Sequence, residues 1–128
     1  MIKNESVSET NAARVIVSGI HLELTPSLRQ AAVDKADRLL RHEEAIIRVR
    51  IDLEFDQTCS ANDQFIAKGR LEISGPDLIA RVNSDGAYKS LDLLVDKLDE
   101  LLRRRHQKRV NTRNDERHQV PEQVDVDS

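Results

Sequence analysis

Apolar and charged residues alternate most strictly between residues 47 and 55. This period of two predicts a strand with one buried face and one solvated face. The side chains predicted to face the core are Ile47, Val49, Ile51, Leu53 and Phe55. A second alternating run covers residues 65–73, and a shorter apolar run covers 78–83. A polar loop at 57–63 and the turn signal Ser74-Gly75-Pro76-Asp77 separate these runs, so we predict three antiparallel strands joined by hairpins.

Two other segments repeat apolar residues at intervals of three and four, which is the spacing of a helix with one buried face. The first follows a short apolar strand at 13–22 and begins where Thr25 can cap the helix and Pro26 suits its first position. The second begins after Ser84 or Asp85, either of which can act as a cap. Its predicted buried face consists of Tyr88, Leu91, Leu94, Val95, Leu98, Leu101 and Leu102.

The predicted order of elements is β-α-β-β-β-α, which places the chain in the α+β class. We expect two layers, in which a four-stranded sheet is covered on one face by two helices. The chain of 128 residues has the length of one domain. Because it contains only three aromatic residues, Leu, Ile, Val and Ala must fill the core.

The ends of the chain differ in composition from its middle. We predict a folded domain at 14–110, a disordered N-terminal extension at 1–13 and a disordered acidic tail at 111–128. The tail contains Pro121, has no aromatic residue, and holds two Arg against five Asp or Glu, a net charge of −3. Such a segment cannot bury enough apolar surface to offset its conformational entropy.

Positive charge is concentrated in parts of a chain whose net charge is −3. Residues 14–110 hold 17 Lys and Arg against 16 Asp and Glu, and residues 103–109 contain five cations and no acid. Lys97, Arg104 and Lys108 are spaced by 7 and 4 residues, which places them on one stripe of the last helix. If the two helices lie side by side, cations of the first would join this stripe in a groove suited to phosphates. The alternative is a solvated helix end whose cations complement the helix dipole.

Other chemistry finds little support in the sequence. The single cysteine, Cys59, lies in a polar loop beside no evident base, and the four histidines lack the spacing of metal ligands. The carboxylates of the strand at 47–55 share their face with Arg48 and Arg50, as expected of a solvated sheet face. We therefore expect no enzyme activity, metal, cofactor or small-molecule substrate. With no apolar run of membrane-spanning length and no secretory signal, we expect a soluble cytoplasmic protein without membrane partners.

Two short motifs resemble those of a known family. The first is Leu24-Thr25-Pro26-Ser27-Leu28-Arg29 after a short strand. The second is Asp85-Gly86-Ala87-Tyr88-Lys89-Ser90-Leu91-Asp92, followed by Asp96-Lys97-Leu98. Together with the element order, they resemble the ribosome hibernation promoting factor family, which includes the ribosome-associated inhibitor A (ribosomal subunit interface) proteins. The resemblance covers about residues 14–110 and corresponds to the family's short form.

The resemblance implies a shape related to double-stranded-RNA-binding domains and an inhibitor of translation under stress or in stationary phase. It implies binding to rRNA and proteins of the small ribosomal subunit, in the channel for mRNA and tRNA anticodon arms, and a monomer off the ribosome. The matching Tyr88 could be structural or could face RNA. The implied RNA-binding residues are Arg29, Lys35, Arg38, Arg41, Tyr88, Lys97, Arg103, Arg104, Arg105, Lys108 and Arg109.

The chain also departs from the family pattern. Glu100 stands where the family usually has a basic residue, and Asp37 and Asp99 are expected to dilute the positive face. These acids favour an alternative function, in which the same fold serves as a protein-interaction regulator with weakened rRNA binding.

Overall fold

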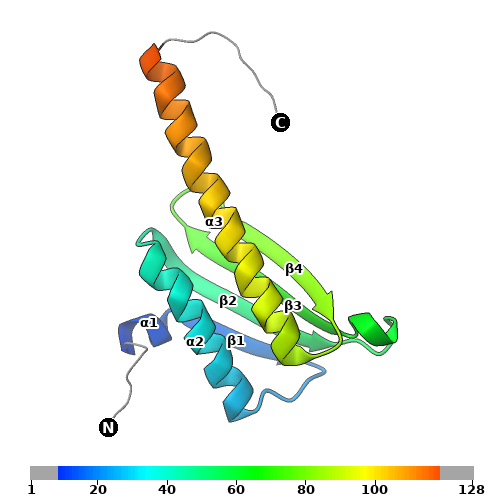
Figure 1. Cartoon of the computed structure of the whole chain (residues 1–128). Helices are drawn as coiled ribbons and strands as arrows, with labels where there is room; N and C mark the ends of the chain where they lie inside the picture. Colours follow the sequence, from blue (N-terminus) through cyan, green and yellow to red (C-terminus); the bar gives the residue numbers. More distant parts are fainter. Residues whose placement is uncertain (1–8, 119–128) are drawn as a thin grey trace.

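The computed structural model describes the backbone of residues 9–118 and the side chains of residues 11–108. It confirms the predicted α+β class and the two layers, with α2 and α3 on one face of a four-stranded sheet (Figure 1). The elements are α1 (Glu9–Ala13), β1 (Val15–Ile20), α2 (Pro26–His42), β2 (Ile46–Phe55), the 3-10 turn η1 (Ala61–Asp63), β3 (Phe65–Ile73), β4 (Leu78–Ser84) and α3 (Ala87–His118).

The sheet has the order β1-β2-β3-β4. β2, β3 and β4 form the predicted antiparallel meander. β1 pairs with β2 in parallel, with Val15 opposite Val49, and α2 makes the connection between these two strands. The start of α2 is as predicted, because the backbone amide of Leu28 donates to the Thr25 hydroxyl at 3.1 Å.

The start of β2 corrects one predicted orientation. The register shifts between Ile46 and Arg48, as in a β-bulge. Ile46 is therefore the buried residue, at 1% exposure, whereas Ile47 is 58% exposed, so its prediction as a core residue is wrong. From Val49 onward the predicted alternation is confirmed, and Val49 and Ile51 are fully buried.

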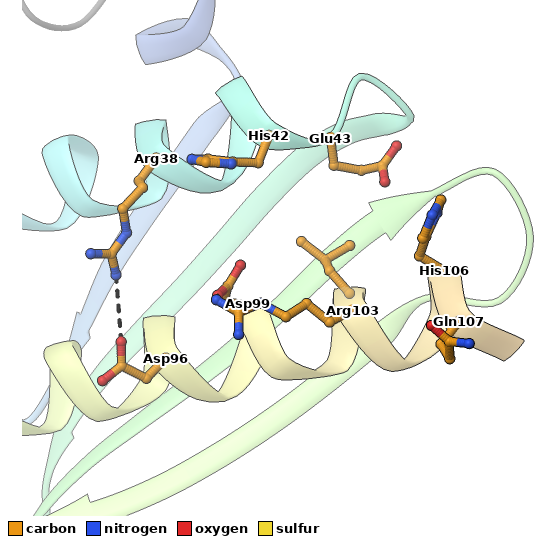
Figure 2. Close-up of a pocket in the computed structure, with 9 residues that line it drawn as sticks. Arg38, His42, Glu43, Asp96, Asp99, Arg103, His106 and Gln107 are labelled. Atoms are coloured by element: carbon orange, nitrogen blue, oxygen red, sulfur yellow. Dashed lines mark hydrogen bonds and ion pairs between the residues drawn. The ribbon is translucent and has the colours of Figure 1, made fainter.

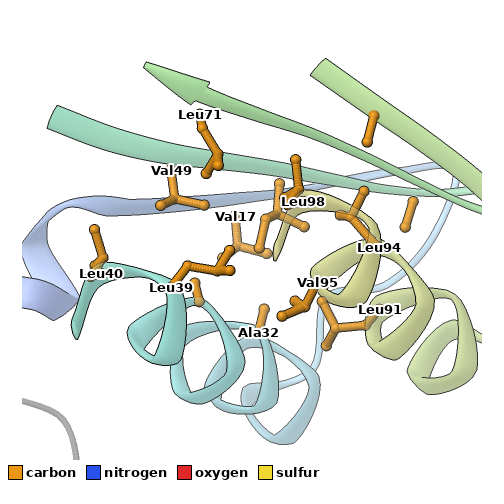
Figure 3. Packing of buried hydrophobic residues seen from close by; sticks show 14 of the residues in the cluster. Val17, Ala32, Leu39, Leu40, Val49, Leu71, Leu91, Leu94, Val95 and Leu98 are labelled. Atoms are coloured by element: carbon orange, nitrogen blue, oxygen red, sulfur yellow. The ribbon is translucent and has the colours of Figure 1, made fainter. Parts of the chain in front are cut away.

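The core lies between the sheet and the two helices (Figure 3). Leu94 and Leu98 of α3 pack down on Gly69 of β3, where an added Cβ would come within 2.8 Å of the Leu98 side chain. The glycine thus lets the helix approach the sheet closely. Of the residues predicted on this helix face, Tyr88 is the exception, since it is 50% exposed. Ser90 is buried instead, and its hydroxyl donates to the Phe65 carbonyl at 2.7 Å.

Both ends of the predicted domain are longer than expected. α1 occupies Glu9–Ala13, and α3 continues to His118, so helices reach into both ends for which the sequence predicts disorder. The disorder of these ends stays a prediction. Residues 1–8 and 119–128 lie outside the described structure. The helix can continue because Pro121 is the first residue past position 110 that cannot donate a helical hydrogen bond.

Leu102 is the last buried residue among the described side chains of α3, and beyond it the helix projects past the edge of the sheet (Figure 1). Within the described residues, no helix is long and apolar enough to cross a membrane.

Candidate nucleic-acid interface

The outer surfaces of α2 and α3 are separated by an open groove (Figure 2). It is lined by Arg38, His42, Glu43, Asp96, Asp99, Leu102, Arg103, His106 and Gln107. The lining therefore holds three carboxylates against two arginines. A groove of this composition has no excess of positive charge when its histidines are neutral, contrary to what the cation spacing predicted.

Ion pairs join the two helices across this groove. The Arg38 guanidinium lies 3.5 Å from the Asp96 carboxylate, as Figure 2 shows. One turn earlier, the Lys35 ammonium contacts the Asp92 carboxylate. Because the two pairs advance together along both helices, α2 and α3 run in the same direction. Two of the cations predicted to bind RNA thus have carboxylate partners within the protein.

Three cations of α3 pair with carboxylates of the same helix as well. Arg103 contacts Asp99 at 2.6 Å, and Glu100 receives both Arg104, at 2.6 Å, and Lys97, at 3.8 Å. The contacts of Arg103 and Arg104 join residues four positions apart, and that of Lys97 joins residues three apart. Each is solvent-exposed, so it contributes only about 0.3–0.5 kcal/mol and can be exchanged for another anion. Glu100 therefore lowers the positive potential locally, as the sequence suggested.

The stripe of Lys97, Arg104 and Lys108 faces away from the groove. None of the three lines it, although Asp96 and Asp99 do. At 100° per residue, the stripe lies roughly a third of the way around α3 from those two acids. The prediction that both sets of cations line one groove is therefore wrong. We call Lys97, Arg104 and Lys108 the α3 flank.

The remaining predicted residues are dispersed. Arg29 is exposed at the N-terminal end of α2, and neither it nor Lys108 makes an ion pair with any described side chain. Arg105 donates to the Ser74 carbonyl at 2.7 Å, which fixes α3 to the turn between β3 and β4. Tyr88 is exposed, and its contact with RNA stays a prediction. The Arg109 side chain lies outside the described residues.

Asp37 corrects another expectation, because it does not dilute the exposed face. Its side chain is fully buried, at 0% exposure. One carboxylate oxygen accepts from the Asn11 amide at 2.8 Å, and the other accepts from Arg41 at 2.6 Å. Buried carboxylates are tolerated when they are paired in this way. Asp37 thus holds Arg41 and binds the N-terminal helix α1 to α2.

Asn11 and Arg14 are the residues that the sequence analysis missed. The Asn11 side-chain oxygen accepts from Arg14 at 3.2 Å, and the same guanidinium donates to the Ile46 and Ile47 carbonyls at the bulge. Arg14 thereby donates to two backbone carbonyls at the irregular start of β2. Apolar periodicity has no signal for such contacts, which join residues 26 to 33 positions apart.

Glu72 and Cys59, whose pKa values are shifted, lie away from both helices. The Arg50 hydrogen bond, with further help from Arg48, lowers the pKa of Glu72 on the solvated sheet face. Burial and the nearby Asp56 charge raise the pKa of the Cys59 thiol, which disfavours the reactive thiolate. In the described part of the chain, no three His, Cys, Asp or Glu side chains gather as metal ligands.

Residues 15–110 match the family described as sigma 54 modulation protein / S30EA ribosomal protein. The chain is 28% identical over 104 residues to the ribosome hibernation promoting factor of Azotobacter vinelandii, covering 81% of this chain and 92% of that protein. It is also 28% identical over 95 residues to the factor of the same name from Pseudomonas putida, covering 74% and 88%.

Two solved structures share the fold. A ribosomal subunit interface protein from Coxiella burnetii superposes with a TM-score of 0.64 at 22% identity, covering 73% of this chain and 97% of that one. The N-terminal domain of Protein Y from Thermus thermophilus superposes with a TM-score of 0.58 at 20% identity, covering 69% and 92%.

Proposed function

Because this chain belongs to the sigma 54 modulation protein / S30EA ribosomal protein family, we propose that it is a ribosome hibernation factor. In this proposal it binds the small ribosomal subunit in the channel for mRNA and tRNA, and inhibits translation under stress or in stationary phase. It acts by occupancy rather than catalysis, as a monomer in the cytoplasm. The observation that carries the proposal is the match over residues 15–110, which includes the whole sheet, α2 and most of α3.

The charges of α3 support binding through phosphates. Lys97, Arg104 and Lys108 are exposed on the α3 flank. Lys97 and Arg104 share the surface carboxylate of Glu100 on the same helix, and Lys108 makes no ion pair with a described side chain. Exposed pairs of this kind are weak enough for rRNA phosphates to replace the carboxylate. The chain has three aromatic residues in all, which makes recognition by base stacking a poor match.

The α2 cations can also bind phosphates, but they must first break ion pairs with α3. Lys35 and Arg38 must release Asp92 and Asp96 before they can contact phosphates fully. The two aspartates would then face the RNA, where their charge is repelled. We therefore propose that the α3 flank makes the stronger phosphate contacts and that α2 contributes less.

The second candidate is a protein-interaction regulator with weakened rRNA binding. It is favoured by Glu100, which occupies two cations of the α3 flank, and by the balanced charge of the groove. A regulator of this kind would bind a protein partner without a steep dependence on salt.

Sedimentation separates the two functions. Purified chain is mixed with 30S, 50S or 70S particles at increasing salt and centrifuged through sucrose. A hibernation factor should sediment with 30S and 70S particles and lose affinity steeply with salt. Polysome profiles of stationary-phase cells, blotted for the protein, should place it in ribosomal fractions. Its absence from those fractions, together with no binding to isolated subunits, would favour the second candidate.

A further inference from the structure

The solvated face of the sheet, opposite to the helices, carries a compact group of cations from three strands. Strand register places Arg50 of β2 directly opposite Arg70 of β3, and Lys68 of β3 directly opposite Arg81 of β4. The two pairs lie in neighbouring rows of this face, two residues apart on β3. We call Arg50, Lys68, Arg70 and Arg81 the sheet-face cluster.

The register places cations of neighbouring strands beside each other on this face. Like charges directly opposite each other destabilise a sheet, and here two such pairs are adjacent. The same two rows contain one carboxylate, Asp52, which lies opposite Lys68, and two exposed isoleucines, Ile16 and Ile79. The two rows therefore hold four cations against one carboxylate, an excess of positive charge that suits an anionic partner.

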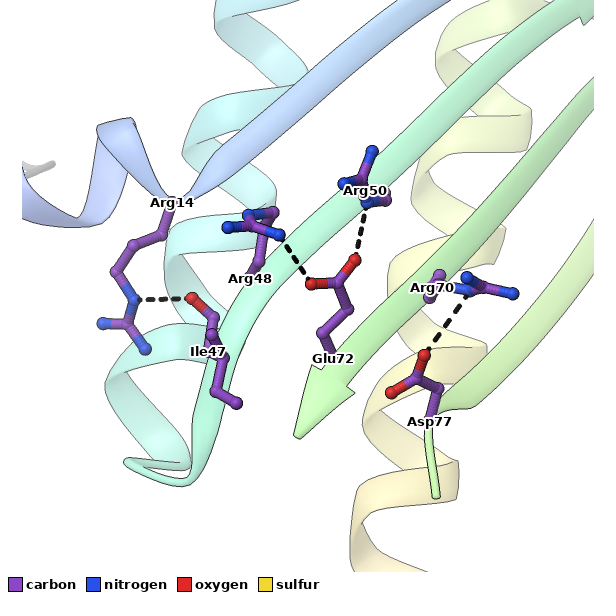
Figure 4. A network of polar contacts seen from close by, with 7 residues as sticks. All are labelled: Arg14, Ile47, Arg48, Arg50, Arg70, Glu72 and Asp77. Carbon is purple, nitrogen blue, oxygen red and sulfur yellow. Dashed lines mark hydrogen bonds and ion pairs between the residues drawn. The ribbon is translucent and has the colours of Figure 1, made fainter. Parts of the chain in front are cut away.

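Acids contact three of the four cations, and Figure 4 draws the contacts of Arg50 with Glu72 and of Arg70 with Asp77. Arg50 shares Glu72 with Arg48, at 2.6 and 2.8 Å. Arg70 and Lys68 make looser pairs with Asp77 and Glu54, at 3.7 and 3.6 Å.

Much of the positive charge remains accessible. Arg81 makes no ion pair with a described side chain, and the side chains of Arg50, Lys68 and Arg70 are 45–50% exposed. A shallow hollow between them is lined by Arg50, Asp52, Lys68, Gly69, Arg70 and Ile79.

We propose that the sheet-face cluster is a second phosphate-binding surface, which contacts an RNA segment different from the one on the helices. An RNA backbone presents anions at regular intervals, and cations on strands about 4.8 Å apart can meet several of them at once. None of the cluster and hollow residues is aromatic, so the contact would position RNA without reading bases. This inference rests on the proposed function and gives the protein one RNA contact on each layer.

The test compares two variants of the full chain with the wild type. Arg70→Gln/Arg81→Gln removes two charges from the sheet-face cluster, and Arg104→Glu/Lys108→Glu serves as the helix-side comparison. Affinity for 30S subunits and for protein-free 16S rRNA is measured from about 50 to 200 mM salt. We expect the sheet variant to bind both about tenfold less tightly and to depend less on salt, by roughly 0.7–0.9 in log–log slope per lost phosphate contact. Its melting temperature should stay equal or rise, because like-charge repulsion is relieved.

The outcomes separate the two proposals. If the helix variant loses binding while the sheet variant binds as the wild type does, the sheet-face inference is overturned and the proposed function stands. If the sheet variant binds the subunit weakly but binds protein-free rRNA normally, the cluster contacts an acidic ribosomal protein and the RNA assignment is wrong. If the wild type binds no subunit, both proposals fail.

Discussion

Arg38 of α2 faces Asp96 of α3 across the groove, with 3.5 Å between guanidinium and carboxylate. The two residues are 58 positions apart in sequence, and only the packing of the helices brings them together. Lys35 contacts Asp92 one turn away. Through these two ion pairs, Lys35 and Arg38 of α2 are bound to carboxylates of α3. An RNA that binds at α2 must therefore compete with carboxylates of the protein itself.

Neutralising these carboxylates should strengthen RNA binding. We expect Asp92→Asn/Asp96→Asn to raise the affinity for 30S subunits several-fold and to steepen its salt dependence, because Lys35 and Arg38 become available to phosphates. Filter binding or sedimentation over a salt series measures both quantities. Asp85→Asn is the matched control, since Asp85 is an exposed acid of the same region that pairs with Lys89. Equal gains in the control and the double variant would show that only net charge matters.

Reversing the exposed charges at the end of the α3 flank should have the opposite effect. Arg104→Glu/Lys108→Glu should abolish co-sedimentation with small subunits at moderate salt, because both phosphate contacts become repulsive. The fold should persist, since both positions follow Leu102, the last buried residue among the described side chains of α3. Circular dichroism checks the fold, and Lys89→Glu serves as a control outside the α3 flank. Undiminished sedimentation of the double variant would remove the α3 flank from the interface.

Truncating Leu98 should destabilise the whole domain. The side chain is fully buried and lies against Gly69, where the helix is closest to the sheet. Leu98→Ala should lower the free energy of unfolding by about 2–5 kcal/mol, the usual range for a buried leucine. Urea unfolding followed by circular dichroism measures it. The exposed Leu93 on the same helix provides the control, and Leu93→Ala should change stability far less. A loss below about 1 kcal/mol at Leu98 would contradict the packing described above.

Removing the Asn11 amide should loosen α1. Asn11→Ala leaves one oxygen of the buried Asp37 carboxylate without its donor, which should lower the unfolding free energy by about 1–3 kcal/mol. Hydrogen exchange should show faster opening in α1 and in the last turn of α2, where Arg41 also depends on Asp37. Asn62→Ala, in the exposed turn η1, is the control. Wild-type exchange rates in Asn11→Ala would mean that the buried carboxylate does not need this donor.

Periodicity in the sequence determined which faces of the main elements are buried. The alternation from Val49 to Leu53 and the apolar spacing from Leu91 to Leu102 were sufficient to identify the buried faces. The geometry of a strand or helix by itself fixes which of its side chains share a face. The Thr25 cap was also predictable, since its partner is three residues away. Charge pairs at spacing four within α3 belong to the same class of local contacts.

Tertiary structure alone decided how these elements face one another. The rotation of α3 about its axis turns Asp96 toward α2 and Lys97 away from it, so neighbours in sequence belong to different surfaces. The bulge that buries Ile46, and the contact that buries Asp37 beneath Asn11, likewise depend on segments far apart in the chain. The apolar repeat along a strand or helix predicts which side chains face the core. It does not predict which residue of another element lies across the groove. The packing of Leu94 and Leu98 against Gly69 fixes how α3 lies on the sheet, and this position determines which residues of α3 face α2.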